Sequence, residues 1–268
     1  MNPNGRPRVL SLTVPKTALR PNLEAPLVTC IEQLPSPDLR PFVECIWYSA
    51  PTQGVAFDIV PDGCVDVCFV MSENDPRVLL FGTTTQTSSY DIEPGAPHFG
   101  VRFRPGMASL FVGERIADLT DSRVRIGEFL GCSAEEFQDP ISFRTRRQRL
   151  ETLLKSALAR ADVHPSRVIG HAVSAINVRR GDIKVRDVAA ECNLSERQLE
   201  RLFLERVGVP PKLYARIQRF RSVLDHLDDP AEPGGVTIAD VAAMHGYTDQ
   251  SHLIRDFKRF GHELPAIS

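Results

Sequence analysis

The 268-residue chain lacks the short motifs that mark several common enzyme classes. It contains no Walker-type phosphate loop, no dinucleotide-binding glycine pattern, no HExxH zinc motif and no GxSxG nucleophile elbow. His98 is the only histidine before residue 164, whereas a catalytic metal in the first half would normally take three or more protein ligands. We therefore expect no catalytic residues, no metal and no cofactor, and we do not expect an enzyme.

Long apolar runs and paired cysteines are also missing. No stretch approaches the roughly 20 apolar residues of a membrane span, and residues 1–28, interrupted by prolines, carry no secretory signal. The six cysteines form no CxxC pair and are too sparse for a disulfide scaffold. We expect a cytoplasmic protein with no membrane partner, in which residues 1–28 form a poorly ordered extension. Cys64 and Cys68 are compatible with a metal or thiol sensor, but core packing is the favoured interpretation.

The chain carries little net charge. It has 32 basic and 34 acidic side chains, and residues 165–268 alone hold 15 basic and 14 acidic ones. That balance is a weak electrostatic signal for a nucleic-acid-binding domain, because such domains bind phosphates through concentrated positive charge. DNA binding therefore requires the basic side chains of this region to gather on one face.

One pattern is present twice in the last hundred residues. Residues 188–203 and 241–257 each contain an apolar stripe at helical spacing, a turn residue, and a second apolar stripe. The turn residue is Asn193 in the first copy and Gly246 in the second, and both types tolerate a left-handed backbone. The expected N-capping residues are Ser195, Thr237 and Asp249. Each copy therefore predicts a helix-turn-helix unit, which commonly places its second helix in the major groove of DNA.

The outward-facing side chains of the two second helices are the predicted DNA contacts. Arginine can bond two acceptors of guanine, and glutamine can do the same for adenine. The predicted DNA-binding residues are Arg197, Glu200, Arg201, Gln250, Ser251, Arg255 and Lys258. Any single exposed arginine is as easily explained by simple solvation as by DNA contact. Because caps, turns and apolar stripes agree in both copies, the set as a whole favours contact with DNA.

An amphipathic helix is predicted between the copies, over residues 210–227. Its apolar positions follow at intervals of 4, 3, 4 and 3 residues, at Leu213, Ile217, Phe220, Leu224 and Leu227. About seventeen residues make a rod of roughly 25 Å. Such a rod can hold two reading units about one DNA turn, roughly 34 Å, apart.

These features resemble the DNA-binding domain of AraC/XylS-family transcription regulators over residues 165–268. The most specific matching stretch is 246–258, supported by 183–203 and 208–211. The resemblance implies a seven-helix domain with two helix-turn-helix units, and double-stranded promoter DNA as the partner. RNA polymerase and a second copy of the chain are further candidate partners. It assigns base reading to positions within the set above, namely Arg197, Glu200, Arg201, Gln250, Ser251 and Arg255.

Two positions depart from the family pattern. Lys184 stands where the family often has a serine or threonine cap, so the first leading helix is expected to begin poorly. Asp256 is expected close to the DNA-facing side, where it would weaken phosphate contact. Neither departure removes a predicted reading helix.

The front half has the pattern of a β-rich domain. Short strands are predicted at residues 29–34, 56–60, 65–70, 78–81 and 98–103, with helical segments near 106–114 and 125–131 and a helix at 147–161. The last of these either links the domains and forms a dimer contact or packs on its own domain. We expect an N-terminal small β-barrel or cupin-like sensory domain over 29–131, a helical linker over 132–164, and an AraC-type DNA-binding domain over 165–268.

Two stretches of the front half, 61–67 and 100–106, resemble a poorly characterised cupin-like domain that precedes some AraC-type domains. This resemblance implies a sensory role and a small-molecule effector. Arg102 and Arg104 lie on the same face of one predicted strand and are the candidate effector-binding residues. Facing inward they would bind a carboxylate or phosphate; facing outward, the favoured orientation, they would be solvated.

The sequence thus predicts an α+β protein that binds DNA sequence-specifically, reads two adjacent major grooves and responds to an effector. A cupin-like enzyme and a protein-interaction module, each with a helix-turn-helix domain used for targeting, are the alternatives. The near-neutral charge of residues 165–268 keeps the interaction module open.

Overall fold

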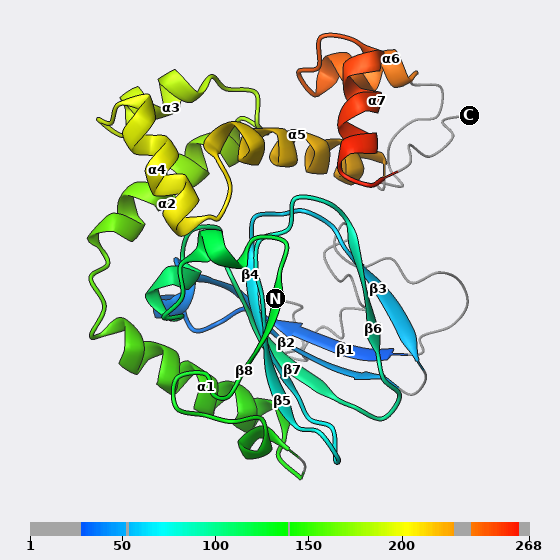
Figure 1. The fold of residues 1–268 in the computed structure, drawn as a ribbon, viewed down its shortest axis with the longest axis vertical. Coiled ribbons are helices and arrows are strands. Elements are labelled where there is room, and N and C mark those ends of the chain that lie inside the picture. The colour runs from blue at the N-terminus through cyan, green and yellow to red at the C-terminus, as the bar shows by residue number, and fades with distance from the viewer. Residues whose placement is uncertain (1–27, 52–53, 139, 228–236, 263–268) are drawn as a thin grey trace, which may run out of the picture.

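The computed structural model describes residues 28–51, 54–138, 140–227 and 237–262 (Figure 1). Strands occupy the first half of these residues and helices the second half, which confirms the predicted α+β class. The extension predicted over residues 1–28 lies, apart from Val28, outside the described residues.

Six strands form one antiparallel sheet in the order β1-β2-β7-β4-β5-β8. They are β1 (Val28–Gln33), β2 (Val43–Pro51), β4 (Val65–Val70), β5 (Arg77–Phe81), β7 (His98–Phe103) and β8 (Arg123–Ile126). β3 (Val55–Ile59) and β6 (Ser88–Ile92) pair as a separate two-stranded sheet. Short 3-10 helices lie between the strands and after them: η1 (Pro37–Leu39), η2 (Ala108–Leu110), η3 (Ile116–Leu119) and η4 (Glu135–Phe137).

The sheet is open, which corrects the expected barrel. Among the described residues β1 and β8 are the two edges of the sheet and do not pair with each other. Alternating apolar residues predict strands, but closure depends on the strand tilt and stagger, which that pattern does not specify. The helix expected near 125–131 is also wrong. Residues 125 and 126 belong to β8, and Leu130 and Gly131 have φ angles of 54° and 76°, which a right-handed helix cannot contain.

Both faces of the sheet are covered, and the pleat decides which side chain lies on which face. Phe99 and Phe103 of β7 point to the main core, where the Phe99 ring packs with Phe137 and with Phe143 of helix α1 (Phe143–Leu158). Leu150 of α1 is fully buried there. The helix predicted at 147–161 therefore packs on its own domain, one of its two predicted roles. Alternate residues such as Cys68 of β4 point to the opposite face and a smaller apolar cluster.

Six helices follow α1 in the described residues: α2 (His164–Val178), α3 (Val185–Glu191), α4 (Glu196–Arg206), α5 (Pro211–Leu227), α6 (Ile238–Met244) and α7 (Gln250–Arg259). Together with α1 they give seven α-helices after the sheet. The pairs α3–α4 and α6–α7 are the two predicted helix-turn-helix units, and they lie at opposite ends of α5 (Figure 1). Residues 263–268 lie outside the described part.

Candidate nucleic-acid interface

The second helix of each unit begins at a side chain that caps it. In α4, Ser195 Oγ accepts from Gln198 N at 3.3 Å while Gln198 Oε1 accepts from Ser195 N at 2.9 Å, which makes a complete capping box. In α7, Asp249 Oδ1 accepts from His252 N at 2.7 Å. These bonds satisfy backbone donors that the first helical turn leaves free, and so they fix where each outward face begins.

The turns and leading helices also follow the sequence pattern. Asn193 and Gly246 have φ angles of 54° and 70°, the left-handed conformation that both turns require. Thr237 and Asp240 form a second capping box at the start of α6. Lys184 precedes α3 without a side-chain cap, as predicted from its departure from the family pattern. Four of these five positions therefore hold the two units in shape through local hydrogen bonds or backbone conformation.

All seven side chains predicted to contact DNA are exposed on α4 and α7: Arg197, Glu200, Arg201, Gln250, Ser251, Arg255 and Lys258. Arg201 is 75% exposed and has Glu205 of the same helix 4.0 Å away. Arg255 Nε donates to Ser251 O at 3.2 Å, also within its helix. Such surface contacts are weak, so both guanidinium groups are available to a partner.

Asp256 does not lie on this surface, which corrects the expectation that it weakens phosphate contact. It is fully buried and pairs with Arg216 of α5. The helical spacing explains the placement, because Asp256 follows Leu253 by three residues and shares its inward face. The negative charge is thus balanced inside the second unit and is not presented to DNA.

α5 joins the two units through the apolar face that its spacing predicts. Ile217 and Phe220 are fully buried. The Phe220 ring lies 4.8 Å from the ring of Phe257 in α7 and 4.9 Å from that of Phe260, measured between centroids. With 17 residues, α5 is roughly 25 Å long. α7 is therefore attached directly to the helix that also carries the first unit.

The sheet domain contributes one buried apolar side chain to the core of each helix-turn-helix unit. Met107 packs among the residues of α2, α3 and α4, and Val60 packs among those of α5, α6 and α7. Gly63 lies so close to the Tyr214 ring of α5 that a Cβ at this position would stand 2.4 Å from a ring carbon. The two halves of the chain therefore share their packing, a relationship that the sequence did not reveal.

Hydrogen bonds also tie the sheet domain to both units. Thr83 Oγ1, fully buried, donates to Val207 O at 2.6 Å, and Thr120 Oγ1 donates to Gly208 O at 2.8 Å, both just after α4. At the other end, Thr87 N donates to Phe260 O at 2.9 Å, just after α7. A single loop, residues 82–87, thus reaches both units.

Arg102, a candidate effector-binding residue, belongs to an ion-pair chain that crosses the domain boundary. Its Nε lies 3.1 Å from Asp66 Oδ1 and its Nη1 lies 3.5 Å from Asp62 Oδ2. Asp62 in turn pairs with Arg221 of α5 at 3.3 Å. Burial raises the pKa of the Asp66 carboxyl, and the Arg102 guanidinium opposes that rise. The charge of Arg102 is thus balanced by carboxylates of its own domain.

Arg104, the other candidate, is exposed and its Nε donates to Arg40 O at 2.8 Å.

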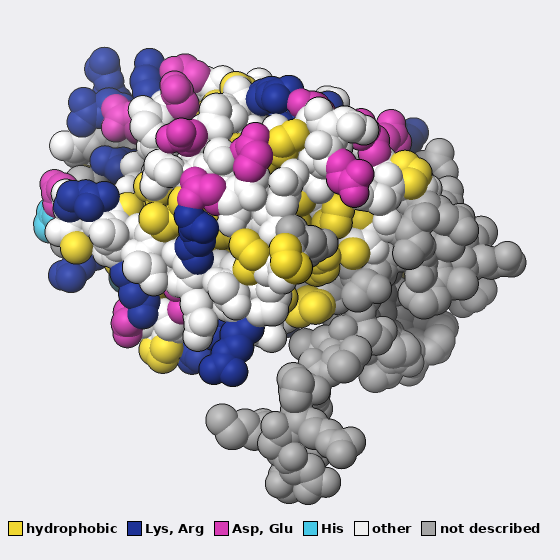
Figure 2. Space-filling model, turned by 90° about the horizontal axis from the view of Figure 1, so that it is seen from below, with side chains coloured by type: hydrophobic (Ala, Val, Ile, Leu, Met, Phe, Trp, Pro, Cys, Tyr) yellow, Lys and Arg dark blue, Asp and Glu magenta, His cyan; other side chains and the backbone are white. Residues whose placement is uncertain are grey.

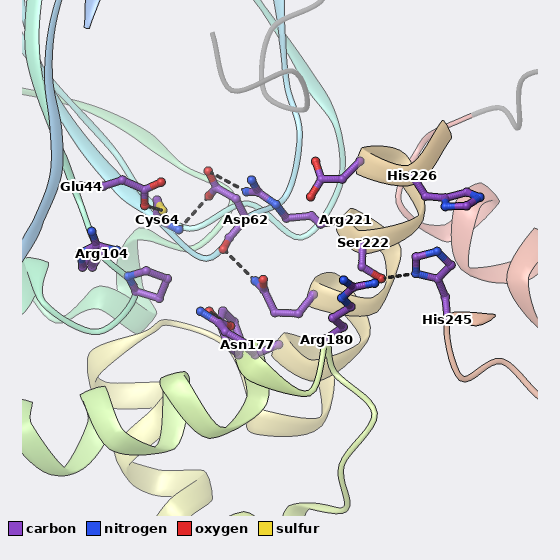
Figure 3. A pocket seen from close by; sticks show the side chains of 14 residues that line it. Glu44, Asp62, Cys64, Arg104, Asn177, Arg180, Arg221, Ser222, His226 and His245 are labelled. Atoms are coloured by element: carbon purple, nitrogen blue, oxygen red, sulfur yellow. Dashed lines mark hydrogen bonds and ion pairs between the residues drawn. The ribbon is translucent and has the colours of Figure 1, made fainter. Parts of the chain in front are cut away.

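A cavity of about 480 Å³ lies where this chain of ion pairs crosses between the domains (Figure 3). Glu44, Cys64 and Arg104 line it from the sheet side, and Arg180, Ser222 and His245 line it from the helical side. Among these, sequence reasoning singled out Arg104 as a candidate effector contact and Cys64 as a possible sensor thiol. The others sit in different elements with no shared motif, so no spacing signal could have found them.

The helical wall of the cavity places positive charges near His245. Burial lowers the pKa of His245 to about 4, and the charges of His226 and Arg180 act in the same direction. Ser222 Oγ and His245 Nδ1 lie 2.7 Å apart and share a hydrogen bond. Arg180 is exposed, and its guanidinium makes no ion pair or hydrogen bond with another described residue. His245 is therefore neutral near pH 7.

The cysteines of the described residues form no metal site. Cys64 and Cys68 are both free and buried, and burial raises the pKa of each thiol. No group of three or more metal-ligating side chains occurs within the described ranges. The described helices also include none with the length and hydropathy that crossing a membrane requires. Seen from the sheet side, charges of both signs are mixed over the surface (Figure 2).

Comparison with known proteins agrees with the two-part architecture. Residues 188–266 match the family model of a helix-turn-helix domain. The C-terminal part is an AraC-type helix-turn-helix domain. Residues 31–125, ahead of this AraC-type domain, match a domain of unknown function (DUF6597). The first of these matches confirms the predicted resemblance of the rear half, and the second covers most of the predicted sensory domain.

Individual relatives are more distant. The regulatory protein HrpB of Ralstonia nicotianae is 32% identical over 91 residues, which are 34% of this chain and 19% of that protein. This chain thus spans about a fifth of that relative's length. Two crystal structures of ToxT from Vibrio cholerae cover 89% and 87% of this chain at 11% and 10% identity, with TM-scores of 0.40 and 0.41; each match covers 94% of the ToxT chain.

Proposed function

We propose that this protein is a sequence-specific DNA-binding transcription regulator that reads two adjacent major grooves with α4 and α7. One observation carries the proposal: two capped recognition helices, each with exposed arginine or glutamine side chains, are attached to the two ends of one helix of 17 residues. Helix-turn-helix units that read successive grooves need a spacing near one DNA turn, about 34 Å.

The residues that we propose to contact DNA divide by chemistry. Arg197, Arg201, Gln250 and Arg255 carry planar groups that can bond two acceptors, or a donor and an acceptor, on a base edge. Glu200 can accept from the amino group of cytosine, whereas Ser251 and Lys258 suit a phosphate or a base. Residues 165–268 carry almost no net positive charge, so contacts with phosphates alone would bind DNA weakly. Contacts with bases must therefore supply much of the affinity for DNA.

We further propose that the sheet domain makes DNA binding responsive to an effector. Its contacts reach both helix-turn-helix units, through Thr83 and Thr120 beside α4 and through Thr87 beside α7. A ligand that binds the docked and undocked arrangements with different affinity would therefore change how the two recognition helices are presented.

The test uses the full chain and duplexes selected from a random pool. Fluorescence anisotropy at one fixed salt concentration compares a selected duplex with a scrambled duplex of the same composition. We expect the selected duplex to bind at least about 10³-fold more tightly. Equal affinity for both duplexes would contradict sequence-specific reading, and no binding to either would favour a protein-interaction module.

A further inference from the structure

We propose that Arg219 of α5 is a positioning residue that fixes the two recognition helices relative to each other and so determines which spacing of two DNA blocks the protein accepts. It acts by joining the loop that leads into α3 of the first helix-turn-helix unit to the turn that leads into α7 of the second. The role in DNA spacing rests on the function proposed above, whereas the contact between the units does not.

The two helix-turn-helix units meet directly, in addition to sharing α5. The loop between α2 and α3 lies beside the turn between α6 and α7 (Figure 1). A Cβ added to Gly246 in that turn would stand 2.8 Å from the carboxylate carbon of Asp182 in that loop. Gly246 therefore supplies the left-handed backbone of the turn and also allows the loop of the first unit to approach it closely.

Arg219 binds both sides of this contact. Its Nη2 donates to Gly181 O at 2.9 Å and lies 3.7 Å from Asp182 Oδ1, both in the loop that leads into α3. Its guanidinium carbon lies 5.4 Å from the centroid of the Tyr247 ring, in the turn of the second unit. A guanidinium group can make both contacts at once, because its edge donates hydrogen bonds while its planar face lies against an aromatic ring.

The contact is largely shielded from solvent. The Arg219 side chain is 15% exposed, and Tyr247 is 5% exposed. Electrostatic attraction between a cation and its partners is stronger where water is excluded than on an open surface. Gly181 also lies so close to α5 that a Cβ at this position would overlap Ala215 O. The loop of the first unit is thus held at one defined place on α5.

The relative placement of the units matters because DNA is a helix. One base pair more or fewer between two blocks moves the second groove by about 3.4 Å along the axis and turns it by about 35°. The apolar contacts that each unit makes with α5 are non-directional, whereas the Arg219 contact joins the two units to each other. Loss of this contact should therefore allow the two recognition helices to accept more than one spacing.

Binding of the full chain to duplexes of altered spacing tests this role. The duplexes carry the two blocks that the native chain selects, at the selected spacing and with one base pair added or removed between them. We expect the native chain to bind the altered duplexes at least about tenfold more weakly. Arg219→Met keeps much of the side-chain length but loses its donors and charge. It should reduce this discrimination by about threefold or more, with the preferred bases of each block unchanged.

Arg179→Met is the matched control, because it makes the same chemical change close to the contact. The partners of Arg179 are Ala175 O of α2 and Glu191 of α3, both on the side of the first unit. This control should leave the spacing discrimination unchanged. Asp182→Ala is a second test variant, and the 69% exposure of its side chain means that its loss should not prevent folding. It should also reduce the discrimination.

Hydrogen exchange without DNA tests the contact by itself. The amides of Gly181 and Tyr247 each donate to a carbonyl of the preceding helix at 2.9 Å, so their exchange reports on the loop and on the turn. Arg219→Met should speed exchange at both amides, whereas Arg179→Met should leave Tyr247 unchanged. Circular dichroism establishes that each variant is folded, and if Arg219→Met is not, Asp182→Ala serves for both measurements.

The outcomes distinguish this inference from the proposed function. Unchanged exchange at both amides in the folded test variant would overturn the contact between the units. A spacing discrimination that this variant leaves unchanged, or that Arg179→Met reduces equally, would overturn the positioning role. A native chain that selects no pair of blocks would contradict the proposed function, and with it the role in DNA spacing. The exchange measurement would still decide whether Arg219 joins the two units.

Discussion

Asp256 is a charged side chain enclosed in the second helix-turn-helix unit, and Arg216 of α5 is its counter-ion. Asp256 is fully buried, whereas the Arg216 side chain is 28% exposed. Removing one partner of such a pair leaves the other without compensation, which costs more than the pair itself contributes. Asp256→Asn should therefore lower the free energy of unfolding by roughly 3 kcal/mol.

Chemical denaturation of the full chain measures this loss. The matched control is Asp187→Asn, because Asp187 pairs with Arg186 on an exposed helix surface and should contribute less than about 1 kcal/mol. Similar losses in the two variants would show that the burial of Asp256 does not matter to stability.

His98 gives the sheet domain a specific dependence on pH. Burial lowers its pKa to about 4 from an ordinary value of 6.5. In the neutral ring Nδ1 donates to Ala96 O at 2.7 Å, and Nε2 accepts from the Tyr90 hydroxyl at 3.2 Å. Between these two pKa values the unfolded chain binds a proton that the folded chain excludes. The free energy of unfolding contributed by His98 is thus fully present above pH 6.5 and is lost as the pH falls toward 4.

Unfolding curves at several pH values from about 7 to about 4 check this prediction. Other groups also titrate there, so the informative quantity is the difference between the native chain and His98→Gln. That difference should shrink as the pH falls, because only the native chain loses the contribution of the neutral imidazole. A difference that is constant with pH would show that His98 titrates normally.

At the scale of elements, local patterns predicted most of the structure. The five predicted strands, the capped helices and the rod over 210–227 are present because each rests on short-range physics: alternation, caps and helical spacing. Strands β2, β6 and β8 were not predicted. β6 and β8 are largely exposed, so they lack the apolar alternation that marks a half-buried strand. Their conformation comes from pairing with β3 and β5, which is a non-local cause.

The rod α5 should be the element on which the second unit most depends. Phe220 is fully buried and its ring contacts those of Phe257 and Phe260. Phe220→Ala should lower the free energy of unfolding by about 3–5 kcal/mol, because the cavity it leaves cannot fully close. Val178→Ala, at a position 78% exposed, is the control and should change it by less than about 0.5 kcal/mol. Equal midpoints of denaturation for the two variants would contradict the packing described here.

At the scale of the whole molecule, the sequence predicts a sensory domain and a DNA-binding domain. It does not predict that the two domains pack against each other. Met107 and Val60 come from the sheet domain yet lie in the cores of the two units. The candidate site shows the same limit. The exposed positions of α4 and α7 follow from one repeated pattern, whereas the residues that line the cavity come from both sides of a domain boundary that no local pattern records.

Removal of the buried hydrogen bond from Thr83 tests the contact between the sheet domain and the first helix-turn-helix unit. Thr83→Val keeps the shape but leaves Val207 O without its donor, which should cost about 1–3 kcal/mol. Thr152→Val removes an exposed hydrogen bond within α1 and serves as the control. Hydrogen exchange of the full chain should show faster exchange around residues 207–208 in Thr83→Val only. Unchanged exchange there would mean that the sheet domain does not restrain the first unit.

The central claim is that one chain reads two successive major grooves, one with each recognition helix. Selection of bound duplexes from a random pool, repeated with Arg201→Ala and Arg255→Ala, tests it most directly. The native chain should select two blocks of preferred bases about 10 base pairs apart, and each variant should lose preference in a different block, at a cost of about 1–3 kcal/mol. Arg144→Ala should select the same two blocks as the native chain. A single block, or loss of the same block in both arginine variants, would contradict reading by two helices.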